Sequence, residues 1–299
     1  MTVQPVFGRV LTAMVSPMRD DGSLDVDAAQ RLAAHLADHS HDGLILAGTT
    51  GESATLTDAE KRDLLRAVVD AVGDRLQVLA GAGTNDTAHS VELARAAAKE
   101  GAHGLLAVTP YYNKPPQAGV LAHFRAIADA TDLPVMVYDI PGRTGIPIAT
   151  ETLLALADHP RIVAVKDAKG DLWASSRVLS ETDLQYYSGD DALNLAHLTQ
   201  GAVGIASVVA HVAGDSYAEL VTSVAQGRLA RAIEIHRGLM PAVEAVMNIT
   251  QGAIMVKAAL VELGVLRSAA VRLPLVPATD DQVAALRSGL ALSRLSGLS

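Results

Sequence analysis

Short apolar runs alternate with longer amphipathic stretches along the first 224 residues of the chain. Each run has the length and the Val, Leu and Ile content that are typical of a strand buried on both faces. The chain contains eight of them: VLTAMV from residue 10, GLILAG from 43, QVLAGAG from 77, GLLAVTP from 104, VMVYDIP from 135, IVAVKDA from 162, YYSGD from 186 and GIASVV from 204.

The amphipathic stretches between these runs predict helices. In residues 57–73, Thr57 and Glu60 have the spacing of a capping box, and Gly73 follows the last periodic position. Strands that alternate with helices predict parallel pairing through crossover helices, and eight such units fit a closed (β/α)8 TIM barrel of the α/β class. An open doubly wound sheet is the alternative, but no G-x-G-x-x-G motif follows the first strand.

The strand pattern stops after about residue 224. Residues 226–248, 250–264 and 280–295 read as three helices, and the proline-containing stretch RLPLVPAT connects the last two of them. We therefore expect a catalytic barrel over residues 1–224 and a small C-terminal three-helix domain over residues 225–299.

Composition and charge narrow the class of function. The formal net charge is -9, and no Lys/Arg-rich block is present, which argues against a partner that is nucleic acid or an anionic membrane. The chain has no cysteine, which excludes disulfides, thiolate metal sites and cysteine nucleophiles. The N-terminal residues do not read as a secretory signal, and no apolar run approaches the length of a membrane span. These observations predict a cytoplasmic protein that acts on small molecules.

Lys166 stands inside the apolar run IVAVKDA, where a lysine is costly unless it is paired or neutral. Side chains alternate along a strand, so Ala164, Lys166 and Ala168 are expected to face the barrel interior, and Val163 and Val165 the helices. Burial disfavours the charged amine, and lowering its pKa from about 10.4 to about 7 takes roughly 4–5 kcal/mol. A neutral amine is a nucleophile for carbonyl groups. The strand alone leaves three alternatives open: a Schiff-base lysine, a snorkelling lysine or an internal ion pair.

Other polar residues follow the same strands, where TIM barrels carry their active sites. Tyr138 has the parity of an inward-facing residue, and its phenol is protonated at neutral pH and able to donate a proton. GTTGES, residues 48–53, is either a carboxylate-binding loop or a simple turn. Arg143 lies in a Pro-Gly turn and is suited to bidentate recognition of a carboxylate. The acidic pair Asp190 and Asp191 is either a metal site or, as is more common, a helix cap.

Taken together and in this order, GTTGES, TPYYNKPPQ, YDIPGRTG, VKDA and SGDD resemble the pyruvate-dependent class I aldolase family typified by 4-hydroxy-tetrahydrodipicolinate synthase, also called dihydrodipicolinate synthase. The resemblance covers nearly the whole chain. It implies a lyase that condenses pyruvate with L-aspartate 4-semialdehyde, in the first committed step of diaminopimelate and lysine biosynthesis. It implies no metal and no organic cofactor.

The resemblance also implies roles for individual residues. Lys166 is similar to the lysine that forms the pyruvate imine, and Tyr138 to the acid/base that works with Thr50 and Tyr112 in a proton relay. Tyr112 is expected to reach the neighbouring subunit's site in a homotetramer built as a dimer of dimers. The expected substrate-binding residues are Thr49 and Thr50 for the pyruvate carboxylate, Arg143 for the carboxylate of the aldehyde, Gly189 through its carbonyl, and Ala206.

Some positions depart from the family pattern. Ala206 stands where many members carry a bulkier isoleucine, and Asp139 replaces the commoner asparagine after Tyr138. Asp58 and His89 stand where lysine-inhibited members use a histidine and a glutamate. The latter change disfavours feedback control by lysine.

Three alternatives to the condensation remain. The nearest is a sister lyase or dehydratase that acts on a longer 2-keto acid, such as sialic acid or a keto-deoxy sugar acid. Arg143 argues against it, because such lyases generally lack this arginine. The other two are a metal-dependent barrel enzyme that uses Asp190 and Asp191 and a barrel that binds a ligand without turnover.

Overall fold

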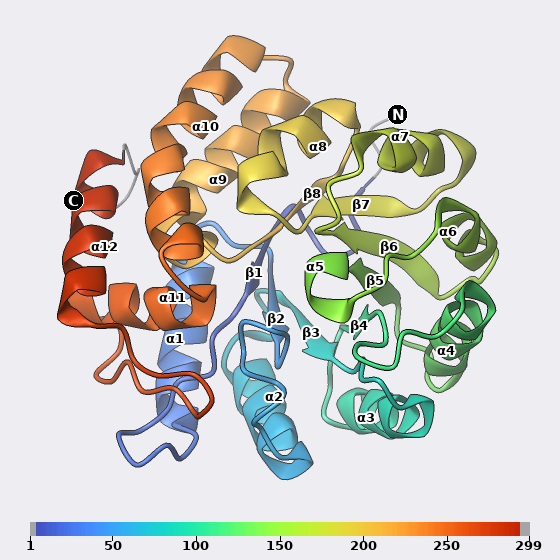
Figure 1. Cartoon of the computed structure of the whole chain (residues 1–299), viewed down its shortest axis with the longest axis horizontal. Helices are drawn as coiled ribbons and strands as arrows, with labels where there is room; N and C mark the ends of the chain where they lie inside the picture. The colour runs from blue at the N-terminus through green and yellow to red at the C-terminus, as the bar shows by residue number, and fades with distance from the viewer. Residues whose placement is uncertain (1–3, 294–299) are drawn as a thin grey trace.

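The computed structural model describes residues 4–293, and its centre is a closed barrel of eight parallel strands (Figure 1). The strands pair in chain order, and β8 pairs with β1 to close the barrel. The predicted TIM barrel and its eight strands are thereby confirmed. The strands are β1 Val10–Ala13, β2 Gly43–Leu46, β3 Gln77–Gly81, β4 Gly104–Val108, β5 Val135–Asp139, β6 Ile162–Asp167, β7 Gln185–Ser188 and β8 Gly204–Ser207.

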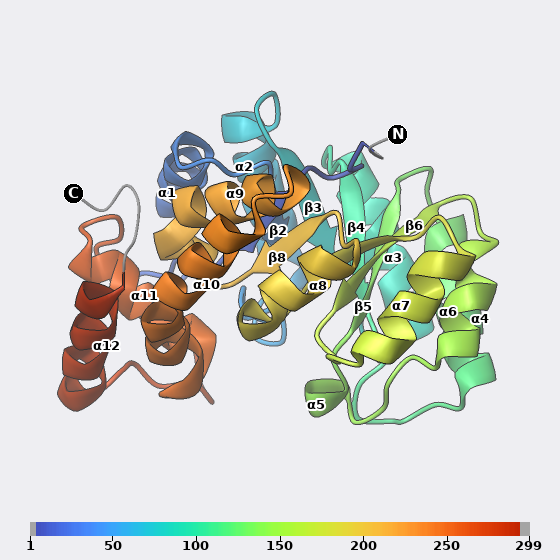
Figure 2. The same ribbon diagram turned by 90° about the horizontal axis from the view of Figure 1, so that it is seen from above.

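Helices follow the strands and surround the barrel, as Figures 1 and 2 show. The predicted capping box is present in α2, Asp58–Val72, where the Thr57 side chain accepts from the backbone of Glu60 and Gly73 forms the C-cap. The short helix α5, Pro141–Thr144, is formed by the Pro-Gly turn that carries Arg143. The other helices of this part are α1 Val26–Asp38, α3 Thr87–Lys99, α4 Gln117–Asp129, α6 Thr150–Ala157, α7 Leu172–Glu181, the 3-10 helix η1 Asp191–Leu193, α8 Asn194–Gln200 and α9 Ala210–Ala225.

The apolar side chains of the strands form two layers, one on each face of the sheet. The inner layer fills the barrel and includes Leu11, Ile45 and Met136, whereas the outer layer joins the strands to the helices. On β6, Ala164 belongs to the inner layer and Val165 to the outer one, as the alternation predicts.

The prediction for Val163 is wrong, because this residue packs against the inner layer. The strand register explains the difference. Val135 of β5 pairs with Ile162 and Met136 pairs with Ala164, so Val163 is an extra residue at a β-bulge. The alternation that places Lys166 inside therefore begins after the bulge.

The C-terminal helices gather beside α9 at one side of the barrel (Figure 1). They are α10 Leu229–Val243, which continues as the π-helical turn η2 Glu244–Asn248, then α11 Gly252–Glu262 and α12 Asp280–Leu292. The three predicted helices are present, and the expected end of the last one at residue 295 lies outside the described residues. The expected domain boundary falls at the end of α9, which closes with Ala225.

Among residues 4–293, no single helix is both long enough and apolar enough to cross a membrane. One bent pair, Leu229–Asn248 with Gly252–Glu262, passes the same test by length and composition only.

Candidate active site

Lys166 and Tyr138 are neighbours across the pair of strands β5 and β6. The register pairs Tyr138 with Lys166 and places Asp139 opposite Asp167. Because side chains alternate, both reactive side chains turn into the barrel and both aspartates turn outward. The Lys166 Nζ atom lies over the Tyr138 ring, 4.5 Å from its centroid.

The Lys166 amine is buried without a carboxylate partner. Its residue is 4% exposed, and no ion pair of Lys166 exists in the described part of the chain. Burial lowers the pKa of Lys166 to about 8, opposed only by the charge of Asp191. The snorkelling and ion-pair alternatives are thereby removed, and the amine is partly neutral near pH 7.

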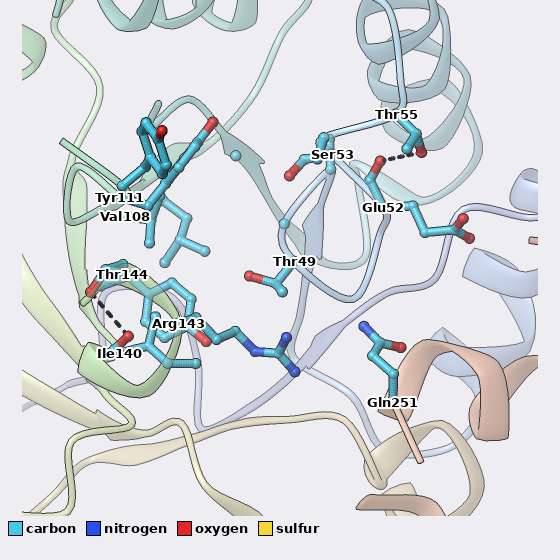
Figure 3. A pocket seen from close by; sticks show the side chains of 18 of the residues that line it. Thr49, Glu52, Ser53, Thr55, Val108, Tyr111, Ile140, Arg143, Thr144 and Gln251 are labelled. Carbon is cyan, nitrogen blue, oxygen red and sulfur yellow. Dashed lines mark hydrogen bonds between the residues drawn. The ribbon is translucent and has the colours of Figure 1, made fainter. Parts of the chain in front are cut away.

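A small cavity of about 70 Å³ lies against Lys166. It shares part of its lining with a wider cleft of about 740 Å³, so the two form one recess above the barrel (Figure 3). Residues from the ends of several strands line the inner cavity, as is usual for a TIM barrel. They include Thr49, Thr50, Tyr138, Arg143, Lys166 and Gly189.

The phenol of Tyr138 is held in its protonated form. Burial raises the pKa of Tyr138 to about 12, although the charge of Arg143 and a side-chain hydrogen bond with Thr49 oppose the rise. A protonated phenol beside the amine is able to donate to an oxygen that becomes negative. The structure brings Thr49 to this phenol, whereas the resemblance implied a relay through Thr50.

The two outward-facing aspartates fix the loops that follow the reactive residues. Asp139 accepts from the backbone N–H of Ile148 and lies 3.2 Å from the Lys169 ammonium. Asp167 accepts from the backbone N–H groups of Lys169 and Gly170, which turns the chain directly after β6. Burial raises the pKa of Asp139 to about 6, because the favourable charge of Lys169 only partly offsets desolvation. These contacts fix the ends of β5 and β6, which carry Tyr138 and Lys166 on their inner face.

Gly189 makes room for the lysine. A Cβ atom at this position would lie 2.9 Å from the Cγ and 3.0 Å from the Cε of Lys166, so a larger residue would displace the amine. Ala206 lies deeper, fully buried in the inner layer with Tyr138, and it lines neither cavity.

Tyr112 points away from the body of the chain. Its side chain lines the rim of the wide cleft, but the residue is 88% exposed and has a φ of +73°. A positive φ is unfavourable for a non-glycine residue and marks a constrained loop. Thr50, in contrast, is buried against the inner cavity. Within one chain, the four residues expected to carry out catalysis do not all converge.

Asp190 and Asp191 both accept hydrogen bonds from backbone N–H groups. Asp190 accepts from the backbone N–H of Ala192 and caps η1, as the cap interpretation predicts. Asp191 is buried and accepts from the Ser207 hydroxyl and the backbone N–H groups of Val208 and Val209. No group of three or more His, Cys, Asp or Glu residues suited to a metal ion occurs among residues 4–293.

Sequence reasoning missed the contribution of the C-terminal helices. Met247, Gln251, Gly252 and Ala253 line the inner cavity together with Lys166, so the segment before α11 forms one of its walls. No motif in TQGAIMVK marks these residues, since a Gln-Gly pair before a helix is an ordinary cap. Periodicity assigns them to a helix without saying which part of the barrel that helix covers.

A second buried lysine was also missed, although the same logic finds it. Lys257 stands in the apolar run AIMVKAAL and is fully buried. Its Nζ donates to the carboxylate of Glu52 and to the carbonyl of Ala270, and the same carboxylate accepts from the backbone N–H of Arg272. The pair therefore ties α11 and its following connector to the loop that carries Thr49.

A closed parallel barrel with a buried amine, a phenol and a recess at the ends of its strands defines a TIM-barrel enzyme. The model of the dihydrodipicolinate synthetase family matches residues 6–292. The chain belongs to this family.

Relatives and solved structures agree with that family. A 4-hydroxy-tetrahydrodipicolinate synthase of Kineococcus radiotolerans is 62% identical over 97% of this chain and 94% of the relative. The dihydrodipicolinate synthase of Cyanidioschyzon merolae, solved with lysine bound, is 44% identical with a TM-score of 0.94 over 97% of this chain and 99% of that chain. The chloride-inhibited enzyme of Acinetobacter baumannii, solved with pyruvate, is 32% identical with a TM-score of 0.93 over 98% and 100%.

Proposed function

We propose that this chain is a 4-hydroxy-tetrahydrodipicolinate synthase, which condenses pyruvate with L-aspartate 4-semialdehyde. The observation that carries the proposal is the unpaired, buried Lys166 amine, whose lowered pKa makes it a nucleophile at the floor of a recess beside Tyr138. The names of the relatives support the choice of substrates. The reaction is the first committed step of diaminopimelate and lysine biosynthesis, and we propose that it takes place in the cytoplasm.

The first half-reaction loads pyruvate onto the enzyme. The neutral Lys166 amine attacks the keto carbon, and the keto oxygen leaves as water to give an imine. Tyr138 donates a proton to the oxygen of the intermediate, while Thr49 and Thr50 hold the pyruvate carboxylate. The Tyr138 phenolate left by that donation then takes a proton from the methyl group, which gives an enamine. Lys166 serves as the electron sink, so the reaction uses no metal and no organic cofactor.

The second half-reaction joins the two substrates. The enamine carbon attacks the aldehyde carbon of L-aspartate 4-semialdehyde, whose oxygen takes up a proton. Arg143 binds the carboxylate of this second substrate, since its guanidinium faces the recess and pairs with no carboxylate in the described part of the chain. The amino group of the adduct then attacks the imine carbon, which closes the ring and releases Lys166.

We propose that the working enzyme is a homotetramer built as a dimer of dimers. The support is Tyr112, whose ring projects from the rim of the cleft in a constrained loop. In a dimer this phenol would complete the relay with Tyr138 and Thr50 in the neighbouring subunit, and Gly189 would contribute its carbonyl. Ala206 lies behind the cavity, so we propose that its small size acts on substrate fit through Tyr138.

Offering both kinds of substrate tests the proposal. We expect the purified chain to consume pyruvate and L-aspartate 4-semialdehyde together, with release of the cyclic product. Cleavage of sialic acid or a keto-deoxy sugar acid, with no condensation of the semialdehyde, would show instead a sister lyase. Binding of pyruvate without turnover of any of these substrates would show a binding protein.

A further inference from the structure

Gln251 and Arg143 face each other across the recess, from the C-terminal helices and from the barrel (Figure 3). Both residues line the inner cavity and the wider cleft. Gln251 directly precedes α11 and forms its N-cap. The two side chains therefore meet at the place where the C-terminal segment closes over the barrel.

The cap fixes which way the Gln251 amide points. Its Oε1 atom accepts from the backbone N–H of Ala253 at 2.6 Å and lies near that of Ile254. Since the oxygen is held by the helix, the Nε2 group is turned into the recess, toward the Arg143 guanidinium (Figure 3). The opposite orientation of the amide would leave the first N–H groups of α11 without their acceptor.

The two facing groups are both hydrogen-bond donors. Within residues 4–293, neither the Nε2 group of Gln251 nor the guanidinium of Arg143 has a side-chain or backbone acceptor. Among the described residues, the one acidic residue that lines the wider cleft is Glu52, whose carboxylate is held by Lys257. Arg143 is exposed and Gln251 is half-buried, so both donors are open to a ligand that enters the recess. A carboxylate that binds between them can accept from both, and it is the acceptor that suits an arginine fork.

We propose that Gln251 is a specificity-determining residue, whose amide Nε2 shares the carboxylate of the second substrate with Arg143. The inference rests on the proposed function and adds a second donor to the carboxylate site. Gln251 thereby couples substrate binding to the position of α11, because the same amide caps that helix and contacts the substrate.

The variant Gln251→Glu separates the two roles of the side chain. A glutamate keeps the oxygen that caps α11, and its negative charge is favourable at a helix N-terminus, so the fold is maintained. In place of the donor, however, the recess receives a second carboxylate oxygen, which repels the substrate and competes for Arg143. The matched control is Gln282→Glu, which makes the same charge change in the first turn of α12, outside the lining of the recess.

The experiment measures steady-state kinetics for both substrates, together with trapping of the pyruvate imine by borohydride. For Gln251→Glu we expect a rise of about tenfold to about a hundredfold in the KM for the semialdehyde, because one hydrogen bond to a charged group is worth about that much. Imine trapping and the KM for pyruvate should stay within about twofold of the unmodified chain, as should all values for Gln282→Glu. Gln251→Met, which loses the donor without adding charge, should show a smaller rise than Gln251→Glu.

Two outcomes would overturn the assignment while leaving the proposed function intact: an unchanged KM for the semialdehyde in Gln251→Glu, or an equal rise in both KM values. The first would show that the amide does not touch the substrate, and the second that the variant has displaced the recess as a whole. Absence of condensation by the unmodified chain would instead overturn the proposed function and this inference together.

Discussion

The Nζ atom of Lys166 lies 4.5 Å from the centre of the Tyr138 ring, with no carboxylate paired to it in the described part of the chain. The second buried lysine, Lys257, has a partner in Glu52. Burial lowers the pKa of both lysines; the charge of Asp191 opposes the effect at Lys166, and a direct hydrogen bond with the Glu52 carboxylate opposes it at Lys257. On this contrast we propose a chemical role for Lys166 and a structural role for Lys257.

Replacing the unpaired amine should cost activity and improve stability. For Lys166→Met we expect loss of turnover by several orders of magnitude, since the nucleophile is gone. At pH 7 the free energy of unfolding should rise by about 2–3 kcal/mol, because keeping a proton on an amine of lowered pKa costs about that much. Urea unfolding curves at constant pH measure the change.

Lys169→Met is the matched control for that variant. Lys169 lies 3.2 Å from the buried carboxylate of Asp139, so its removal should lower the free energy of unfolding by about 1–3 kcal/mol. If both variants destabilise the fold to the same extent, Lys166 is part of an ion pair and the assignment is wrong.

Imine formation should depend on pH through the Lys166 amine. The folded pKa of about 8 lies below the ordinary lysine pKa of 10.5, so the reactive neutral form is lost as pH falls through 8. We expect the rate constant for imine formation with pyruvate to fall about tenfold per pH unit below 8 and to level off above it. Stopped-flow measurement of imine formation from about pH 6 to about pH 10 gives this profile. A midpoint near 10 would mean that burial does not lower the pKa.

The lowered pKa of Lys166 should also make the free energy of unfolding depend on pH. Because the folded pKa of about 8 lies below the unfolded pKa of 10.5, the buried amine destabilises the fold fully below pH 8, and this cost disappears as pH rises from 8 to 10.5. The difference in unfolding free energy between Lys166→Met and the unmodified chain should therefore shrink between pH 8 and pH 10.

Arg143 should affect the second substrate and spare the first. In Arg143→Ala the pyruvate imine should form as before, while the KM for the semialdehyde rises about tenfold to about a hundredfold through loss of a charged hydrogen-bond pair. Initial rates with each substrate varied in turn provide the comparison. Arg231→Ala, at an exposed ion pair, is the control. Full retention of condensation by Arg143→Ala would remove the reason to prefer the synthase over a sister lyase.

The ion pair between Glu52 and Lys257 should show strong coupling in stability. Lys257→Met leaves the Glu52 carboxylate buried with only the backbone N–H of Arg272, which should cost about 3–5 kcal/mol. The double variant Glu52→Gln with Lys257→Met should cost clearly less than the single one, because no charge is then left buried. Urea unfolding of Lys257→Met, of Glu52→Gln alone and of the double variant completes the cycle, and additive effects would mean that the pair is not a unit.

The barrel and the inward placement of Lys166 and Tyr138 could be predicted because they follow from local properties of the sequence. A strand period of two places Lys166 and Tyr138 inside, and the ends of parallel strands lie at one face of a barrel. The β-bulge that turns Val163 inward could not be foreseen, since it arises from pairing with β5. Gln251 and the pair of Glu52 with Lys257 were missed because their contacts join segments more than a hundred residues apart in the chain.

Reduction with borohydride in the presence of pyruvate, followed by peptide mapping, tests the central claim most directly. We expect a stable mass increase equal to one reduced pyruvyl group, located on Lys166, and no label in Lys166→Met. Label on another lysine, or no label at all in a chain that condenses its substrates, would contradict the assignment of Lys166 as the nucleophile.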